Sequence, residues 1–376
     1  MLICSMFKMK RFWIVLLVPM SVVLTMLAHR WPLAAERWFS QGLYRLLAAT
    51  YGRVFGYLPF SVAQFLVIAL PILAIVYIVR RRWTASRLVA NAACVVGVVW
   101  FMFTMLAGLN YARLEFSELI GLEVQPASMG DLVALGDVLA KRLNELSFEV
   151  DRADDEQMQL SKGNFATARR ARDAFRTAGE EFPVLGGFVS LPKPIIYSQF
   201  FSCLRIVGIY SPFTMEANVN VHVPDYHIPA TMLHELAHFK GIMREDEANF
   251  IAWLVGKRSG DAEFMYSAYM LAFSHTAGQL RRVSYGDYRR IMDGLADGVH
   301  ADLRANQEYW QQFTGPLADI STAANDAYLR ANRQEDGVDS YGRMVDLLIA
   351  HYADQRYPRL LNVRLPSKLE YSPSPV

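Results

Sequence analysis

Two histidines and a glutamate in the second half of the chain have the spacing of a catalytic metal site. His234, Glu235 and His238 form the pattern His-Glu-x-x-His. On an α-helix, residues four apart lie on one face, so the imidazoles of His234 and His238 can bind one ion. Zinc held in this way lowers the pKa of a water molecule, and Glu235 can take the proton as that water attacks a carbonyl group. These residues predict a zinc-dependent hydrolase in which Glu235 is the general base and then the general acid.

A catalytic zinc ion also needs a third protein ligand and one open position. The nearest downstream candidates are Glu245, Asp246 and Glu247. On an unbroken helix, Glu245 would lie about 10 Å beyond the second histidine, too far to share an ion. We therefore expect Gly241 to end the first helix in a left-handed conformation, so that a second helix over about 244–253 folds back. Glu245 and Asn249 share a face of that helix, which favours Glu245 as the ligand over Glu247, with Asn249 supporting a ligand histidine.

Other residues around the motif leave alternatives open. Tyr266, Tyr269 and His275 have the chemistry to stabilise an oxyanion, and their spacing does not choose among them. The segment Glu216–Val223 alternates polar and apolar residues, as a half-buried strand does. It is either an edge strand that pairs with an extended peptide or an ordinary core strand.

The first third of the chain carries the elements that anchor this site. Each of three uncharged apolar runs approaches or exceeds the roughly 20 residues that a membrane-spanning helix needs. Lysine and arginine gather before the first run and between the second and third, which predicts that both sites are cytoplasmic. The chain after Asn110 is then extracytoplasmic, and we expect a membrane domain over 1–110 and a globular domain over 111–376. The three runs are 12–28, 60–79 and 88–109.

Composition narrows the function classes further. Of the 376 residues, 53% are hydrophobic and 20% are charged, which fits a membrane protein with one globular domain. The net charge of +2 gives no reason to expect a nucleic-acid partner. Three widely separated cysteines, Cys4, Cys94 and Cys203, argue against a disulfide framework.

Two resemblances add to this interpretation. Residues 245–249, Glu-Asp-Glu-Ala-Asn, resemble the Glu-x-x-Ala-Asp/Asn element of gluzincin peptidases, in which the first glutamate is the third zinc ligand. The resemblance implies that role for Glu245, while Asn249 stands where aspartate is more usual. More broadly, the three apolar runs and residues 208–224, 234–250 and 336–352 look like a bacterial family of membrane proteins of unknown function, described only as candidate zinc peptidases.

We therefore expect a multi-pass protein of the bacterial cell membrane, mainly α with a small β-sheet. Three transmembrane helices would precede a zincin-like metallopeptidase domain that binds Zn²⁺ through His234, His238 and Glu245. Its partners would be a peptide or protein substrate and the lipid bilayer. The alternative is a non-catalytic zinc-binding membrane sensor or scaffold with the same fold, although a purely structural site has no need of Glu235. An intramembrane protease is disfavoured because 228–243 is short for a span and carries charges.

Overall fold

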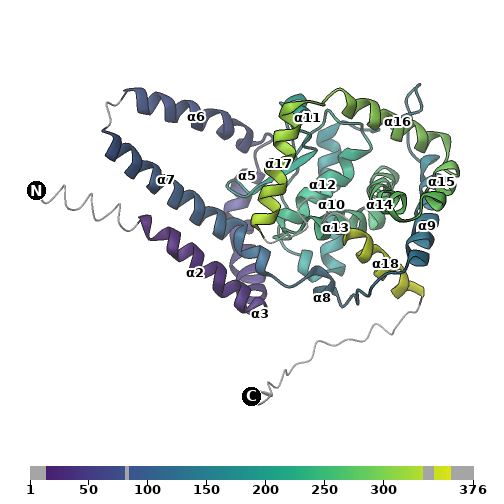
Figure 1. Cartoon of the computed structure of the whole chain (residues 1–376), viewed down its shortest axis with the longest axis horizontal. Helices are drawn as coiled ribbons and strands as arrows, with labels where there is room; N and C mark the ends of the chain where they lie inside the picture. Colours follow the sequence, from purple (N-terminus) through teal and green to yellow (C-terminus); the bar gives the residue numbers. More distant parts are fainter. Residues whose placement is uncertain (1–13, 81–83, 333–342, 357–376) are drawn as a thin grey trace, which may run out of the picture.

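The fold is mainly helical in the computed structural model (Figure 1), which describes residues 14–80, 84–332 and 343–356. A helix-rich globular part stands at one end, and long apolar helices project from it. The projecting helices are α2 (Leu17–Arg30), α6 (Val62–Arg80) and α7 (Ala85–Leu106).

Among the described residues, α6 and α7 are long and apolar enough to cross a membrane. They match the second and third predicted spans. The first predicted span is not shown: α2 has 14 residues, fewer than a crossing helix needs. Its chain breaks at Trp31, just before Pro32, and α2 qualifies only when joined to the segment Pro32–Gly56, bent from it by 106°. Residues 12–13 of that predicted run lie outside the described part of the chain.

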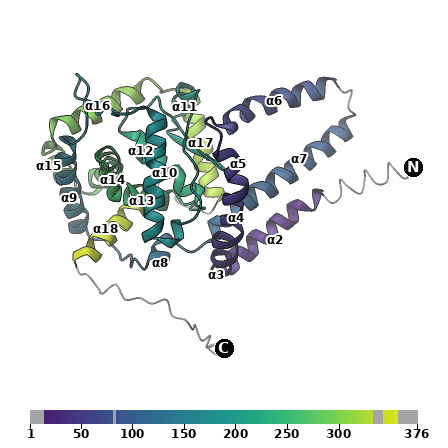
Figure 2. The ribbon, with the colours of Figure 1, turned by 180° about the vertical axis from the view of Figure 1, so that it is seen from behind.

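All three projecting helices meet the globular part at the same end. The last residues of α2 and α7 and the first residues of α6 lie beside it, as both views show (Figures 1 and 2). The connection 31–61 therefore lies at the same end of the helices as the globular part. Arg80, at the other end of α6, lies at the opposite end of the projecting helices.

The connection itself is an almost continuous helical segment, which we call the juxtamembrane segment (residues 32–56). Two of its stretches are π-helical, a rare conformation that often marks functional regions. Its buried Tyr44 and Ala48 join a small apolar cluster with Leu106 of α7 and with Met215 and Phe239 of the globular part. The elements of the segment are α3 (Pro32–Ala34), η1 (Ala35–Tyr44), α4 (Arg45–Leu47), η2 (Ala48–Gly52) and α5 (Arg53–Gly56).

The globular part has one large core, and α12 runs through it. This helix packs against α10, α13 and α14 and also against the sheet. Almost every residue of α12 and α13 is therefore buried, including the polar residues Glu235, Glu247 and Asn249. The helices are η3 (Gly108–Ala112), α8 (Phe116–Ile120), α9 (Met129–Ser147), α10 (Asn164–Glu181), η4 (Pro183–Leu185), α11 (Ser198–Cys203), α12 (His227–Phe239), α13 (Glu245–Arg258), α14 (Ala262–Val283), α15 (Tyr285–Asp293), α16 (Asp297–Gln311), α17 (Pro316–Ala331) and α18 (Arg343–Arg356).

A three-stranded sheet lies beside α12, in the order β1 (Lys193–Pro194), β3 (Glu216–Val219), β2 (Gly208–Ser211). The predicted strand Glu216–Val223 is thus shorter, central and buried at every residue, and is a core strand. Both of its polar side chains form hydrogen bonds inside the fold: Glu216 accepts from the backbone of α6, and the Asn218 amide nitrogen donates to the Ile209 carbonyl. The edge strand next to α12 is β2, antiparallel to β3.

Candidate metal centre

The turn after α12 brings the two predicted ligand helices together. Gly241 has a φ of +80°, which glycine adopts without strain. The amide of Ile242 donates to the carbonyl of Ala237 (3.1 Å), as in a left-handed helix cap. A Cβ at Gly241 would also lie 3.0 Å from atoms of Asn110 and Tyr44. The predicted glycine turn is confirmed, and α13 starts at Glu245 within reach of α12.

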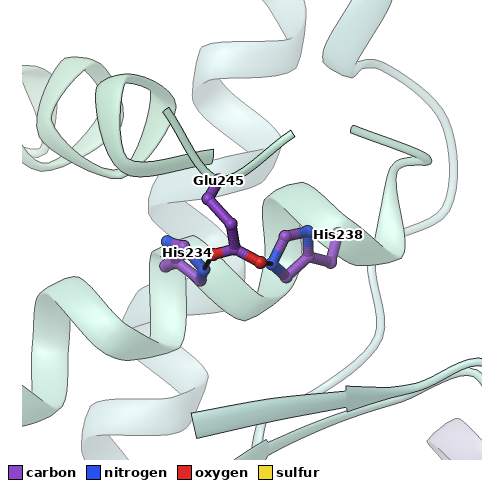
Figure 3. A group of neighbouring side chains, drawn as sticks. All are labelled: His234, His238 and Glu245. Atoms are coloured by element: carbon purple, nitrogen blue, oxygen red, sulfur yellow. Dashed lines mark ion pairs between the residues drawn. The ribbon is translucent and has the colours of Figure 1, made fainter. Parts of the chain in front are cut away.

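His234, His238 and Glu245 converge on one point. Figure 3 shows both imidazole rings of α12 directed at the Glu245 carboxylate. The Nε2 atom of His234 lies 3.3 Å from Glu245 Oε2, and Nε2 of His238 lies 3.6 Å from Glu245 Oε1. The three residues each offer one ligand atom, and these three atoms all lie within 4.8 Å of one another.

The opposite ring nitrogens are held by hydrogen bonds. His234 Nδ1 lies 2.7 Å from Oδ1 of Asn249, and His238 Nδ1 lies 2.7 Å from the carbonyl oxygen of Ile242. Because these oxygens accept, each Nδ1 carries a proton, and Nε2 is the nitrogen that each ring turns toward Glu245. Asn249 thus has the supporting position that its spacing from Glu245 predicted.

These distances fit a zinc ion. Ligand atoms about 2.0–2.1 Å from a tetrahedral zinc are roughly 3.3 Å apart, close to the two separations measured to Glu245. Two imidazoles and one carboxylate are also the donor set of several catalytic zinc sites. Residues His234, His238 and Glu245 would hold the ion.

The electrostatics of the three residues favour a cation. Burial lowers the pKa of His234, but the hydrogen bond and charge of Glu245, together with Glu235 and Asn249, raise it to about 8. Burial lowers the pKa of His238 to about 4, so this imidazole stays neutral near pH 7 and available as a ligand. The negative charge that favours a proton on His234 would equally favour a metal ion, which competes for the same nitrogen.

Glu235 lies beside this group, and one of its two carboxylate oxygens has no hydrogen-bond partner among the described residues. Its side chain is buried, with 3% of the residue exposed, and its Oε2 atom has no hydrogen bond within the described part of the chain. Burial raises its pKa to about 8. The other oxygen, Oε1, lies 2.3 Å from where a Cβ of Gly208 would be, so only glycine leaves room for this carboxylate against β2. A buried carboxyl group with an unused oxygen and a pKa near neutrality can exchange a proton with a small molecule such as water.

The structure holds Glu247 away from the ligand group. Its carboxylate accepts from the backbone amide of Phe116 (2.8 Å) and from Arg244 (3.0 Å), so it ties α13 to α8. Two of the oxyanion candidates also have other partners. Tyr266 donates to Asp302, and Tyr269 accepts a hydrogen bond from Tyr352.

Three tyrosines near the ligands were not singled out by sequence reasoning. The Tyr210 ring of β2 lies 6.4 Å from the His238 ring between centroids, and its hydroxyl is 2.9 Å from that of Tyr44. Partial burial raises the pKa of Tyr328 on α17, and the charge of nearby Glu245 raises it further. Tyr44 and Tyr328 are far from the motif in sequence, and no local pattern relates them to it.

Comparison with known proteins identifies a family whose function is unknown. Residues 39–349 match the family described as "Protein of unknown function (DUF3810)". No curated protein and no solved structure matches the chain. The matched region covers most of the chain, from the juxtamembrane segment to α18, and includes every residue of the candidate metal centre. The chain therefore belongs to the DUF3810 family.

Proposed function

We propose that this protein is a membrane-anchored zinc metallopeptidase with its site on the extracytoplasmic side. The observation that carries the proposal is the pairing of a three-residue ligand group with a buried glutamate whose Oε2 atom has no partner in the described chain. A site built only to bind metal has no need of that carboxylate. The apolar α6 and α7 support a membrane anchor, and α2 is a candidate third span.

The chain's own groups have distinct roles in the proposed reaction. Zn²⁺ bound by His234, His238 and Glu245 would act as a Lewis acid that polarises the peptide carbonyl and acidifies water. Glu235 accepts the proton of the attacking water on its carboxylate and passes it to the departing amine nitrogen. Asn249 and the Ile242 carbonyl keep the two imidazoles in the tautomer and orientation that binding requires.

The edge strand β2 is the natural place for an extended peptide. It lies against α12 next to Glu235, and Ile209 in its middle is exposed. Peptides commonly add as a further strand to such an edge, with backbone hydrogen bonds independent of sequence. This arrangement supports a polypeptide rather than a small molecule as substrate.

Metal analysis of the detergent-purified full chain tests the proposal. We expect about one zinc ion per wild-type chain and its loss in both His234→Ala and Glu245→Ala. Glu247→Gln is the matched control and should keep zinc, because Glu247 bonds Phe116 and Arg244 instead. Well-folded wild type without zinc would contradict the proposal, whereas zinc retained in Glu245→Ala would move the third ligand elsewhere.

A second variant separates catalysis from metal binding. Glu235→Gln should retain zinc and lose peptide hydrolysis about 10²- to 10⁴-fold, because the amide cannot accept the proton of water. The assay uses a peptide substrate identified with the wild-type protein. Full activity in Glu235→Gln would show that another group is the base.

A further inference from the structure

An exposed apolar surface lies at the start of α11, which we call the α11 patch: Ile196, Tyr197 and Phe200. These residues are 64%, 45% and 57% exposed. Neighbouring apolar side chains of that size normally face a partner or a membrane when they gather on a surface. The patch belongs to the globular part, outside the apolar helices that we interpret as spans.

Hydrogen bonds fix the patch to the first turn of α6. The backbone amide of Ile196 donates to Oε1 of Gln64 (3.0 Å). The amides of Val62 and Ala63, the first residues of α6, donate to the buried Glu216 carboxylate at 3.0 and 2.8 Å. Because β3 carries Glu216 and pairs with β1 just before the patch, the sheet joins the patch rigidly to the beginning of this helix.

Lys193, which precedes the patch in the chain, is also held close to the start of α6. Lys193 of β1 donates its ammonium hydrogens to the carbonyl oxygens of Phe55, near the end of the juxtamembrane segment, and of Leu58, just after it. The patch therefore lies at the depth where α6 begins. A helix that spans a bilayer begins at the interface between headgroups and acyl chains.

The charge of the segment that carries the patch also suits a bilayer surface. From 182 to 215 the chain contains no aspartate or glutamate, and its charged residues are Lys193 and Arg205. Arg205, just after α11, is exposed and its guanidinium lies 5.4 Å from the centre of the Trp310 ring. Apolar and aromatic side chains beside an exposed cation are the composition of interfacial membrane contacts, where the cation meets lipid phosphates.

From this geometry we infer that the α11 patch is immersed in the bilayer interface beside α6. The contact adds a monotopic attachment to the transmembrane one and fixes the orientation of the globular part on the membrane. It also brings the metal centre close to the lipid surface, since only the short sheet separates the first turn of α6 from Glu235. A four-residue strand is about 13 Å long. If the proposed peptidase function holds, its substrates are segments that emerge from the membrane.

Site-specific fluorescence tests the contact. In full-length protein with Cys4, Cys94 and Cys203 replaced by serine, a small environment-sensitive fluorophore is attached to Phe200→Cys, Leu73→Cys or Tyr285→Cys. All three native side chains are exposed. Leu73 lies in the middle of α6, and Tyr285 lies on α15, away from the projecting helices (Figure 1). Each variant is reconstituted in phosphatidylethanolamine and phosphatidylglycerol vesicles, with or without lipid carrying a nitroxide near the headgroup end of the acyl chain.

We expect nitroxide lipid to quench most of the fluorescence at position 200 and to leave the fluorescence at position 285 unchanged. Aqueous iodide should do the opposite, quenching position 285 and not position 200. Quenching at position 73 but not at 200 would overturn the inference and leave α6 as a span. Protection of position 200 from both quenchers would also overturn it, by showing that protein covers the patch. Ile196→Cys repeats the measurement should the label at 200 reduce the helix content seen by circular dichroism.

Discussion

Hydrogen bonds at the Nδ1 atoms decide how the two ligand histidines present their lone pairs. Asn249 binds one ring through a side chain, and the Ile242 carbonyl binds the other through the backbone. Only the first of these contacts can be removed without disturbing the glycine turn. Asn249 is therefore the position at which the contribution of ring orientation to metal affinity can be measured.

Asn249→Ala should weaken zinc binding about 10- to 100-fold, because the His234 ring would be free to rotate and to change tautomer. Competition with a fluorescent zinc chelator measures this affinity in the purified full chain. Asn249→Asp keeps an acceptor oxygen and should bind zinc at least as well as the wild type. Unchanged affinity in Asn249→Ala would show that packing alone orients the ring.

Site residues could be predicted when they lie close in sequence to the His-Glu-x-x-His motif. His234 and His238 follow from helix periodicity, and Glu245 from the need for a turn at Gly241. The partner of His238, the Ile242 carbonyl, is a backbone group and carries no side-chain signal. Tyr44 and Tyr210 are 166 positions apart and meet only because the juxtamembrane segment folds over α12. No pattern in a single sequence encodes that contact.

At the scale of elements, the end of α12 is held by Tyr44 of the juxtamembrane segment and by Arg113, which follows η3. Tyr44 of η1 donates to the carbonyl of Phe239 (3.3 Å), and Arg113 donates to the carbonyl of Lys240 (3.2 Å). Free carbonyls at a helix end need such donors when they are buried. Arg113 is itself held by both oxygens of Glu36, at 2.7 and 2.9 Å, and both side chains are buried.

Breaking this buried pair should destabilise the fold strongly. Glu36→Ala leaves the Arg113 charge buried without its carboxylate, which costs roughly 3–5 kcal/mol in comparable pairs. Thermal unfolding followed by circular dichroism in detergent measures the loss. The double variant Glu36→Ala with Arg113→Met should lose less than the sum of the single variants, because no unpaired charge remains. Strictly additive losses would mean that the pair does not act as a unit, and Glu145→Ala, in an exposed pair, should change little.

Element prediction succeeded where periodicity is strong and failed where tertiary contacts decide. The α12–turn–α13 arrangement and the two long apolar helices match their patterns. Alternation predicted a half-buried strand, but every residue of β3 is buried. Its polar residues Glu216 and Asn218 tolerate burial because they have hydrogen-bond partners inside the fold. An alternating pattern shows which residues are polar. It does not show that the first amides of α6 will donate hydrogen bonds to the buried Glu216 carboxylate. The π-helical stretches of the juxtamembrane segment likewise have no sequence signature that we recognise.

At the scale of the whole molecule, residues on both sides of the predicted boundary at 110/111 pack into one apolar cluster. The apolar cluster that contains Tyr44 and Leu106 also contains Met215, Phe239 and Met243. The family match begins at residue 39, within η1, and so includes most of the juxtamembrane segment. Hydropathy marks where the long apolar helices end, but it does not mark where a folding unit begins.

A chain that starts at Tyr111 should therefore fail to form the metal centre. It would expose Phe239 and Met243 to water, leave the Arg113 charge without Glu36, and leave Glu216 without the amides of α6. We expect this fragment to aggregate or to purify without zinc, whereas a chain that starts at Ile14 should keep both the fold and the ion. Size-exclusion chromatography with metal analysis distinguishes the two outcomes. A monomeric, zinc-loaded 111–376 fragment would show that the globular part folds alone and that the contacts across the boundary only orient it on the membrane.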